Sequence, residues 1–171
     1  MHGNEDQATG LQIRPAHPDE YDAIAALTVD VYVGDGYVAD GDEYMQELAA
    51  VAHRAAEAEV MVAVHEGQVV GSLTVAEPGT PYAEIARSGE LEFRMLAVSK
   101  QARGLGVGTA LVRAVVDQAR SGGYEAVALT TMFSMVDAHR IYERLGFVGV
   151  PERDWATHDG LQLMVMRLAL S

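Results

Sequence analysis

The feature that most constrains this chain is a glycine-rich turn, QARGLGVG at 101–108, between an apolar segment and an amphipathic one. Leu91–Val98 is typical of a buried strand, and apolar residues recur at helical spacing from the turn to about Ser121. Glycine lets the backbone adopt positive φ and approach a ligand closely. Because successive amide N–H groups at a helix start can converge on an anion, the turn predicts a phosphate-binding site.

Two common nucleotide fingerprints do not fit this turn. A dinucleotide motif needs a third glycine, but the sixth position is Thr109 counted from Gly104 and Leu111 counted from Gly106. A Walker A loop needs Gly-Lys followed by Ser or Thr, and Gly108 is followed by Thr109 without a lysine. These spacings disfavour a dehydrogenase and a P-loop enzyme. The spacing Q-x-x-G-x-G remains, and so does a strand–helix connection without a ligand.

The rest of the chain predicts one mixed α/β domain of order β-α-α-β-β-β-α-β-α-β-β. The first predicted strand is short and ends at Pro15. Six further strands are predicted at Glu59–His65, Gln68–Ala76, Leu91–Val98, Val127–Thr130, Phe147–Val150 and Leu161–Leu168. Four helices are predicted. The first begins at Pro18, the second covers 42–58, the third runs from the turn to about Ser121, and the fourth extends from about Met135 to Leu145. We expect residues 1–9 to be a flexible polar lead-in and residues 10–171 to form the domain.

The amino-acid composition limits which binding partners and locations the chain can have. The 171 residues carry 25 acidic and 12 basic side chains, a net charge of −13, which disfavours nucleic acid and anionic lipid. No run of about 18 apolar residues occurs, so we expect no membrane span. The chain has no cysteine, which fits a cytoplasmic location and excludes thiolate metal sites and thiol nucleophiles.

Two motifs together resemble the GNAT acetyltransferase superfamily. Gln101, Gly104 and Gly106 match its Arg/Gln-x-x-Gly-x-Gly/Ala acyl-CoA motif, after a strand that ends in MLAV at 95–98. A second match has four residues in register, namely Ala138, Tyr142, Gly146 and Phe147. The asparagine that begins this second pattern in the family has no counterpart here. The resemblance implies a single-domain fold with a mixed, mostly antiparallel central sheet flanked by helices.

The resemblance also implies a binding mode for acetyl-CoA as co-substrate. Main-chain atoms of a splayed strand would pair with the pantetheine arm, and amides of the turn would hold the pyrophosphate. The cofactor-binding residues implied in this way are Leu96, Ala97, Val98, Gln101, Arg103, Gly104, Gly106, Val107, Gly108 and Thr109.

The implied activity is transfer of an acetyl group to a primary amine by direct attack. Tyr142 stands at the position of the family's general acid, and a phenol can protonate the departing thiolate. Glu92 is the leading base candidate, acting through a water, with Glu90 as a weaker substitute. The backbone N–H of Leu96 or Ala97 would stabilise the oxyanion. No metal is expected, and a non-catalytic acyl-CoA-binding module of the same fold is the alternative.

The resemblance also implies an acceptor site between the first two helices and the loop that joins the last two strands. These segments are rich in carboxylates and aromatic rings, which suit a cationic amine through ion pairing and cation–π contact. The predicted substrate-binding residues are Asp35, Tyr37, Tyr44 and Trp155. A peptide amine and a small-molecule amine fit this site equally well. The sequence is also compatible with a homodimer.

Overall fold

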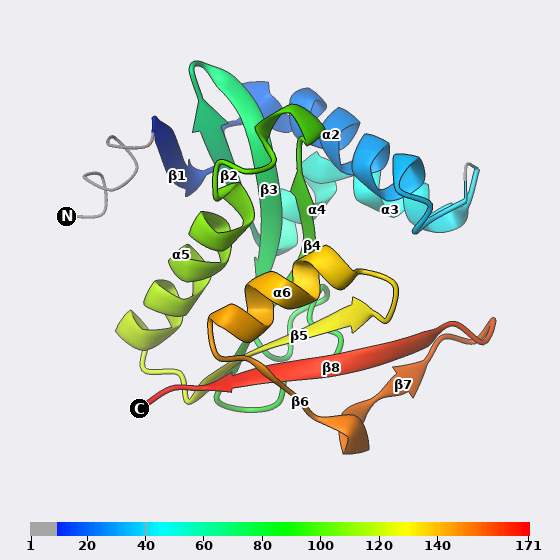
Figure 1. Ribbon diagram of the computed structural model, residues 1–171, viewed down its shortest axis with the longest axis vertical. Coiled ribbons are helices and arrows are strands. Elements are labelled where there is room, and N and C mark those ends of the chain that lie inside the picture. The colour runs from blue at the N-terminus through cyan, green and yellow to red at the C-terminus, as the bar shows by residue number, and fades with distance from the viewer. Residues whose placement is uncertain (1–9, 40) are drawn as a thin grey trace.

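The computed structural model describes residues 10–39 and 41–171, so the lead-in predicted at 1–9 lies outside the described residues. Figure 1 shows the elements in colour from blue to red along the chain. The strands are β1 (Leu11–Pro15), β2 (Glu59–His65), β3 (Gln68–Ala76), β4 (Glu90–Val98), β5 (Ala126–Met132), β6 (Val148–Gly149), β7 (Trp155–Ala156) and β8 (Gln162–Ala169). The helices are η1 (Pro18–Glu20), α2 (Tyr21–Gly34), α3 (Glu43–Ala49), α4 (Val51–Glu57), η2 (Lys100–Ala102), α5 (Val107–Ser121), α6 (Val136–Arg144) and η3 (Pro151–Arg153).

The strands form one mixed sheet in the described part of the chain, in the order β1-β2-β3-β4-β5-β8-β6, with β7 pairing to β8. Every neighbouring pair is antiparallel except β4 and β5. The predicted fold class, a mixed and mostly antiparallel sheet flanked by helices, is therefore confirmed. The hairpin of β2 and β3 has the predicted bounds.

The single helix predicted over 42–58 is instead two helices that meet at Ala50, where φ is −82° and ψ is 61°. Arg54 explains how this break is stabilised. Its guanidinium, almost fully buried, donates hydrogen bonds to the carbonyl oxygens of Glu47 (2.8 Å) and Leu48 (3.2 Å) at the end of α3. A buried side chain thus supplies hydrogen-bond donors to carbonyl groups at the end of α3, where regular helical bonding stops. Alanine-rich composition alone predicts no such interruption.

Helices cover both faces of the sheet. In Figure 1, α5 and α6 lie in front, and α2, α3 and α4 lie behind. The front core packs Leu111, Val115 and Phe93 together, and the rear cores gather Val31 and Leu48 with neighbours. Because both faces are covered, the central strands are apolar on both sides.

A glycine on β3 lets α5 begin close to the sheet. A Cβ built on Gly71 would lie 2.6 Å from Cγ1 of Val107 and 3.0 Å from Cδ1 of Leu111. Real Cβ atoms are essentially never found so close to a neighbour, so a side chain here would displace the first turn of α5. Gly71 therefore fixes where the glycine-rich turn sits relative to β4.

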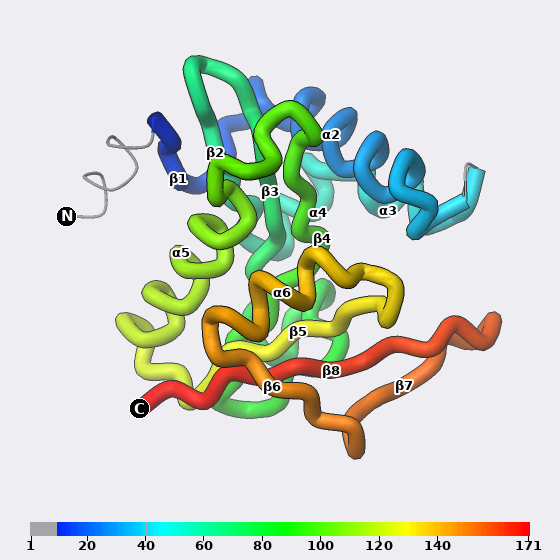
Figure 2. The backbone as a smooth tube through the Cα atoms, viewed as in Figure 1, coloured from blue at the N-terminus to red at the C-terminus, as the bar shows by residue number. Residues whose placement is uncertain are grey.

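The two parallel strands separate halfway along their length. β4 pairs with β5 from Glu90↔Ala126 to Phe93↔Leu129, and no further pair follows although β4 continues to Val98. In Figure 2, β4 and β5 diverge from a common lower region, and α6 lies in front of the opening. A register shift against β3 and a positive φ of 60° at Met95 mark a bulge at this point. The separation leaves residues 94–98 without a neighbouring strand on the β5 side.

A buried ion-pair cluster ties the base of this opening to the C-terminal part of the chain. Glu90, which is 4% exposed, accepts hydrogen bonds from Arg153 (2.9 Å) and Arg167 (2.8 Å) and from the backbone N–H of Arg87 (3.0 Å). Arg153 also donates to the carbonyl oxygen of Ile85 at 2.7 Å. Glu90, the weaker base candidate, therefore lies in a structural cluster that links the loop before β4 to η3 and β8.

We expect Glu90→Gln to lower the free energy of unfolding at pH 7 by about 3 kcal/mol, because two guanidinium groups lose a buried counter-charge. Burial alone would raise the pKa of Glu90, but the hydrogen bonds from Arg153, Arg87 and Arg167 outweigh it and lower this pKa from 4.5 to about 2. A lowered folded-state pKa contributes stability above pH 4.5 that is lost as the pH falls toward 2. In urea denaturation, the difference in the free energy of unfolding between the wild type and Glu90→Gln should thus shrink from pH 7 to pH 3. A gap that stays constant with pH would contradict this assignment.

Candidate active site

A cleft of about 1010 Å³ opens where β4 and β5 separate. Its walls come from α2 and α3 on one side, from α5 and α6 on the other, and from β7 with the following loop. Among its lining residues are most of those predicted from the sequence, namely Asp35, Tyr37, Tyr44, Leu96, Val98, Arg103, Gly104, Gly106, Val107, Gly108, Thr109, Tyr142 and Trp155. The structure thus brings the predicted cofactor, acid and acceptor residues to one site.

Three predicted residues are not among those that line the cleft. Ala97 is buried, which is compatible with the main-chain role predicted for it. Gln101 lies in η2, and its side-chain oxygen accepts a hydrogen bond from the Ser99 hydroxyl at 2.7 Å. Glu92, the third, is fully buried and has other partners, as described below.

The glycine-rich turn presents free backbone amides to the cleft. Gly104 and Gly106 have φ of 94° and 76°, values that side chains rarely allow. The first amide bonded back into the turn from α5 is that of Ala110, which donates to the Gly106 carbonyl at 2.9 Å. Across the described residues, no backbone acceptor is found for the amides of 106–109, whereas the Arg103 amide donates to Lys100 at 3.4 Å. This geometry is that of an anion cradle at a helix N-terminus.

Gly108 differs from the other two glycines of the turn because it is a packing residue. A Cβ on it would lie 2.8 Å from Cδ1 of Ile141, whereas a Cβ on Gly104 or Gly106 would meet no protein atom within 4 Å. Gly108 thus allows α5 to approach α6, and Gly104 and Gly106 keep the cleft open.

Asp35, predicted to bind the acceptor, is instead engaged at the mouth of the glycine-rich turn. Its carboxylate accepts a hydrogen bond from Arg103 at 2.8 Å and lies 3.7 Å from the ammonium of Lys100. The cluster connects the end of α2 to the turn. Asp35 therefore lies beside the predicted cofactor residues, where it lowers the net positive charge that Arg103 and Lys100 bring.

Tyr142 lies on α6, lines the cleft and is 4% exposed. Its ring packs edge-on against Phe93 (5.7 Å between centroids) and beside Phe147 (5.9 Å). Burial raises the pKa of Tyr142 well above the ordinary value for a phenol, so its hydroxyl keeps its proton at neutral pH. A protonated phenol on the cleft wall can donate to an anion formed there.

Glu92 holds a loop with its carboxylate. One oxygen accepts hydrogen bonds from three consecutive backbone N–H groups, those of Glu84 (3.0 Å), Ile85 (3.0 Å) and Ala86 (2.9 Å). The second oxygen is buried and has no hydrogen-bond partner in the described part of the chain. The residue at the family's base position thus has a clear structural role in this chain, and its role as a base stays a prediction.

A cluster that sequence reasoning missed lies on the cleft wall next to Glu92. Arg94, with a side chain 8% exposed, lies 3.2 Å from the Glu84 carboxylate and 3.6 Å from that of Glu47. It also donates to the Tyr82 carbonyl oxygen at 3.2 Å. Burial raises the pKa of Glu84, with Arg94 opposing the effect. Because these residues come from a helix, a loop and a strand, no local sequence pattern marks them.

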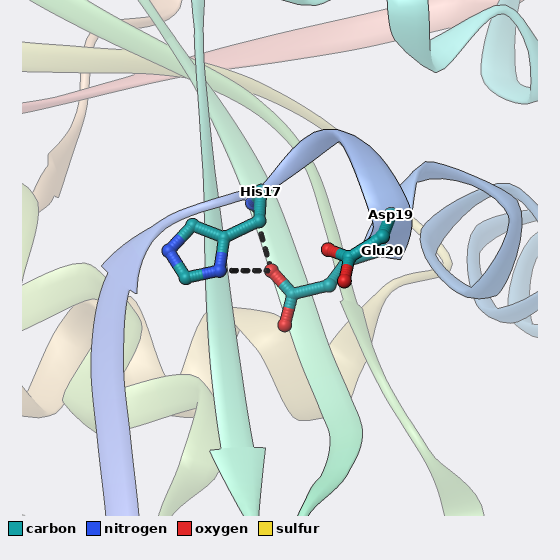
Figure 3. Close-up of side chains that lie close together, drawn as sticks. All are labelled: His17, Asp19 and Glu20. Atoms are coloured by element: carbon teal, nitrogen blue, oxygen red, sulfur yellow. Dashed lines mark hydrogen bonds and ion pairs between the residues drawn. The ribbon is translucent and has the colours of Figure 1, made fainter.

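A metal site has little support in the described residues. The one group of potential ligands found there is His17, Asp19 and Glu20 at the start of η1 (Figure 3). The Glu20 carboxylate already accepts two hydrogen bonds from Arg14 (2.8 and 2.7 Å) and one from the His17 backbone N–H (2.8 Å). These contacts are those of a helix start, and the group lies outside the residues that line the cleft.

In residues 10–39 and 41–171 no helix is both long and apolar enough to cross a membrane.

Comparison with known proteins agrees with this geometry. The family model described as "Acetyltransferase (GNAT) family" matches residues 23–147, which span α2 to the end of the Tyr142 segment. The chain therefore belongs to the GNAT acetyltransferase family, as the two motifs predicted.

Relatives and solved structures show how far the likeness extends. N-acetylaspartate synthetase of Danio rerio is 36% identical over 104 residues, which are 58% of this chain and 33% of that protein. Mycothiol acetyltransferase of Sanguibacter keddieii is 32% identical over 145 residues, 82% of this chain and 44% of that protein. The chain spans a third to under a half of the length of these relatives.

Two solved structures cover nearly the whole chain. A GCN5-related N-acetyltransferase from Kribbella flavida has a TM-score of 0.69 at 26% identity, covering 95% of this chain and 99% of that one. A GNAT family acetyltransferase from Brucella melitensis, solved in complex with acetyl-CoA, has a TM-score of 0.63 at 22% identity, covering 94% and 88%.

We expect Gly106→Val to weaken acetyl-CoA binding at least about 100-fold, since a branched side chain would fill the open space above the amides and strain a left-handed backbone by about 1–2 kcal/mol. Gly67→Val is a matched control. Gly67 has the same φ of +76° and the same open surroundings, but it lies in the hairpin turn before β3. Calorimetric titration with acetyl-CoA should separate the two variants. Equal binding by both would argue against the turn as the pyrophosphate site.

Proposed function

We propose that this chain is an acetyl-CoA-dependent N-acetyltransferase acting on a cationic primary amine. One observation carries the proposal. A strand edge without a partner, a row of free amides and a protonated phenol face the same cleft. A carrier with an extended amide arm and a pyrophosphate fits the first two features, and the phenol stands where its thiolate would leave.

The cofactor fit rests on this chain's own residues. The segment 94–98 offers main-chain groups to an extended arm in the way a strand offers them to a missing neighbour. The amides of 106–109 are placed for a pyrophosphate, and Gly104 and Gly106 leave room for its approach. Acetyl-CoA bound to this site would supply an activated acyl group, and the acetyl-CoA complex of the Brucella melitensis relative supports that choice.

In the proposed mechanism Tyr142 protonates the sulfur as the carbon–sulfur bond breaks. Its raised pKa keeps the proton on the phenol until a thiolate develops beside it. A backbone N–H of Leu96 or Ala97 stabilises the oxyanion of the tetrahedral intermediate. The amine must first lose a proton, because an ammonium has no free lone pair. The resemblance to the family predicts Glu92 for that step.

The proposed acceptor class follows from charge. Seven carboxylate side chains line the cleft against four guanidinium groups, which favours a cation. Tyr37, Tyr44 and Trp155 add aromatic rings for cation–π contact. Arg94 already lies between two carboxylates, so its charge is not available to a carboxylate on the acceptor. A polyamine, a lysine side chain or an aminoglycoside therefore fits better than an aspartate as acceptor. In this respect the proposal departs from the Danio rerio relative, which is named N-acetylaspartate synthetase.

Mixing the protein with acetyl-CoA and an amine panel tests the proposal, with free CoA measured by a thiol reagent. The chain has no cysteine, so the protein itself gives no background. We expect thiol release with spermidine, lysine peptides or aminoglycosides, and little with aspartate. Tight acetyl-CoA binding without turnover on any amine would instead indicate a non-catalytic binding module. Location in the cytoplasm and a homodimer stay predictions.

With an active amine, Tyr142→Phe should lower kcat about 100-fold and leave acetyl-CoA affinity nearly unchanged, because the ring keeps its packing while the proton donor is lost. Tyr124→Phe is the control, since Tyr124 lies in the loop between α5 and β5 outside the cleft lining. Unchanged kcat in Tyr142→Phe would remove Tyr142 from the mechanism.

A further inference from the structure

We infer that Glu84, on the loop between β3 and β4, is the group that takes the proton from the attacking amine, and that Glu92 is a positioning residue for it. The inference rests on the proposed acetyltransferase function and names a catalytic residue for it. It rests on the positions of five side chains around the point at which β4 and β5 separate, namely Glu84, Glu92, Phe93, Arg94 and Tyr142.

Access to the cleft distinguishes the two glutamates. Glu92 is 0% exposed and does not line the cleft, whereas the Glu84 side chain is 37% exposed and lines it. Three backbone N–H groups already bond to one oxygen of Glu92. Its second oxygen is buried as well, so the Glu92 carboxylate has no atom open to an amine in the cleft. Glu84 has one close cation and an open side toward the cleft.

Glu84 and Tyr142 each contact one of two successive residues of β4, Arg94 and Phe93 respectively. Arg94 holds the Glu84 carboxylate at 3.2 Å, and Phe93 packs its ring against that of Tyr142 at 5.7 Å. Phe93 is also the last residue of β4 that pairs with β5. The proposed base and the proposed acid therefore flank the same point, one on each side of the strand, where the unpaired segment begins.

The Glu92 carboxylate fixes the loop that carries Glu84. One of the three amides it binds is the backbone N–H of Glu84 itself, at 3.0 Å. Arg153 holds the same loop through the Ile85 carbonyl oxygen at 2.7 Å. Glu92 on the strand thus acts through the loop, and the loop places a second glutamate at the cleft.

The electrostatic surroundings suit a base. Burial raises the pKa of Glu84, while Arg94 lowers it in part, and Glu92 and Glu47 raise it again. Tyr44 of α3 and Arg54 of α4 are further titratable groups beside this cluster, because both lie near Arg94 and Glu47. A carboxylate whose pKa lies above its ordinary value takes a proton from an ammonium more readily than an ordinary one.

The proposed proton balance is complete. Glu84 takes one proton from the ammonium, and the free amine forms the carbon–nitrogen bond at the thioester carbon. As the tetrahedral intermediate collapses, the carbon–sulfur bond breaks and Tyr142 gives its proton to the sulfur. The nitrogen then releases its second proton to the phenolate, and Glu84 returns the first to solvent. The products are the amide, CoA with its thiol, and one proton.

Steady-state kinetics with acetyl-CoA and an amine found active for the wild type test the inference. We expect Glu84→Gln to lower kcat about 100-fold at pH 7 and to remove the carboxyl limb from the pH profile of kcat/KM. The loss should shrink as the pH nears the pKa of the amine, and it should be smaller for less basic amines. A purely structural role of Glu84 would not produce this dependence on amine basicity.

Two other variants separate the roles. Glu92→Gln keeps an oxygen that accepts the loop amides, so we expect a loss of less than about tenfold with the pH limb retained. Glu77→Gln is the matched control, because Glu77 is an exposed residue at the start of the same loop and does not line the cleft. We expect it to match the wild type.

Three outcomes would overturn the inference. A Glu84→Gln variant with wild-type kcat refutes it while leaving the proposed function intact. Loss of the pH limb in Glu92→Gln with its retention in Glu84→Gln returns the role to Glu92. A wild-type protein that binds acetyl-CoA but acetylates no amine refutes both the base and the proposed function.

Discussion

β4 separates from β5 after Phe93 and Leu129, and both the cleft and its chemistry depend on this separation. Backbone groups that lose a strand neighbour must find water or another partner, because an unsatisfied buried amide or carbonyl is costly. Here the unpaired segment 94–98 opens onto a cleft, and the bulge at Met95 turns the strand at the same point. The opening is thus a built feature of the sheet, maintained by paired strands below it and helices on either side.

The chemistry of the site follows from this opening. Residues on the two faces of β4 reach different walls, so Phe93 supports Tyr142 on one side and Arg94 supports Glu84 on the other. The start of α5 lies close by because Gly71 admits it, which brings the free amides of the turn to the same cleft. The Glu90 cluster joins the loop before β4 to η3 and β8, and so fixes the lower end of the opening.

Local features of the sequence predict much of this. The hairpin of β2 and β3, the glycine-rich turn and the Tyr142 helix each have a signal in consecutive residues, and all three are found where predicted. The break at Ala50 has none, because the group that stabilises it, Arg54, acts across space. The likeness of Glu92 to a family base likewise gave no hint that its carboxylate binds a loop. Glu84, Arg94 and Glu47 are brought together only by the fold, so sequence reasoning did not find them.

Amide hydrogen exchange with and without acetyl-CoA tests the central claim most directly, since the claim concerns backbone groups. We expect bound acetyl-CoA to slow exchange in two separate segments, the amides of 94–98 that β3 does not pair and those of 106–109. The hairpin turn at Glu66 and Gly67 should be unaffected. Tight binding that slows exchange elsewhere and leaves both segments unchanged would contradict the view that the opening between β4 and β5 is the cofactor site.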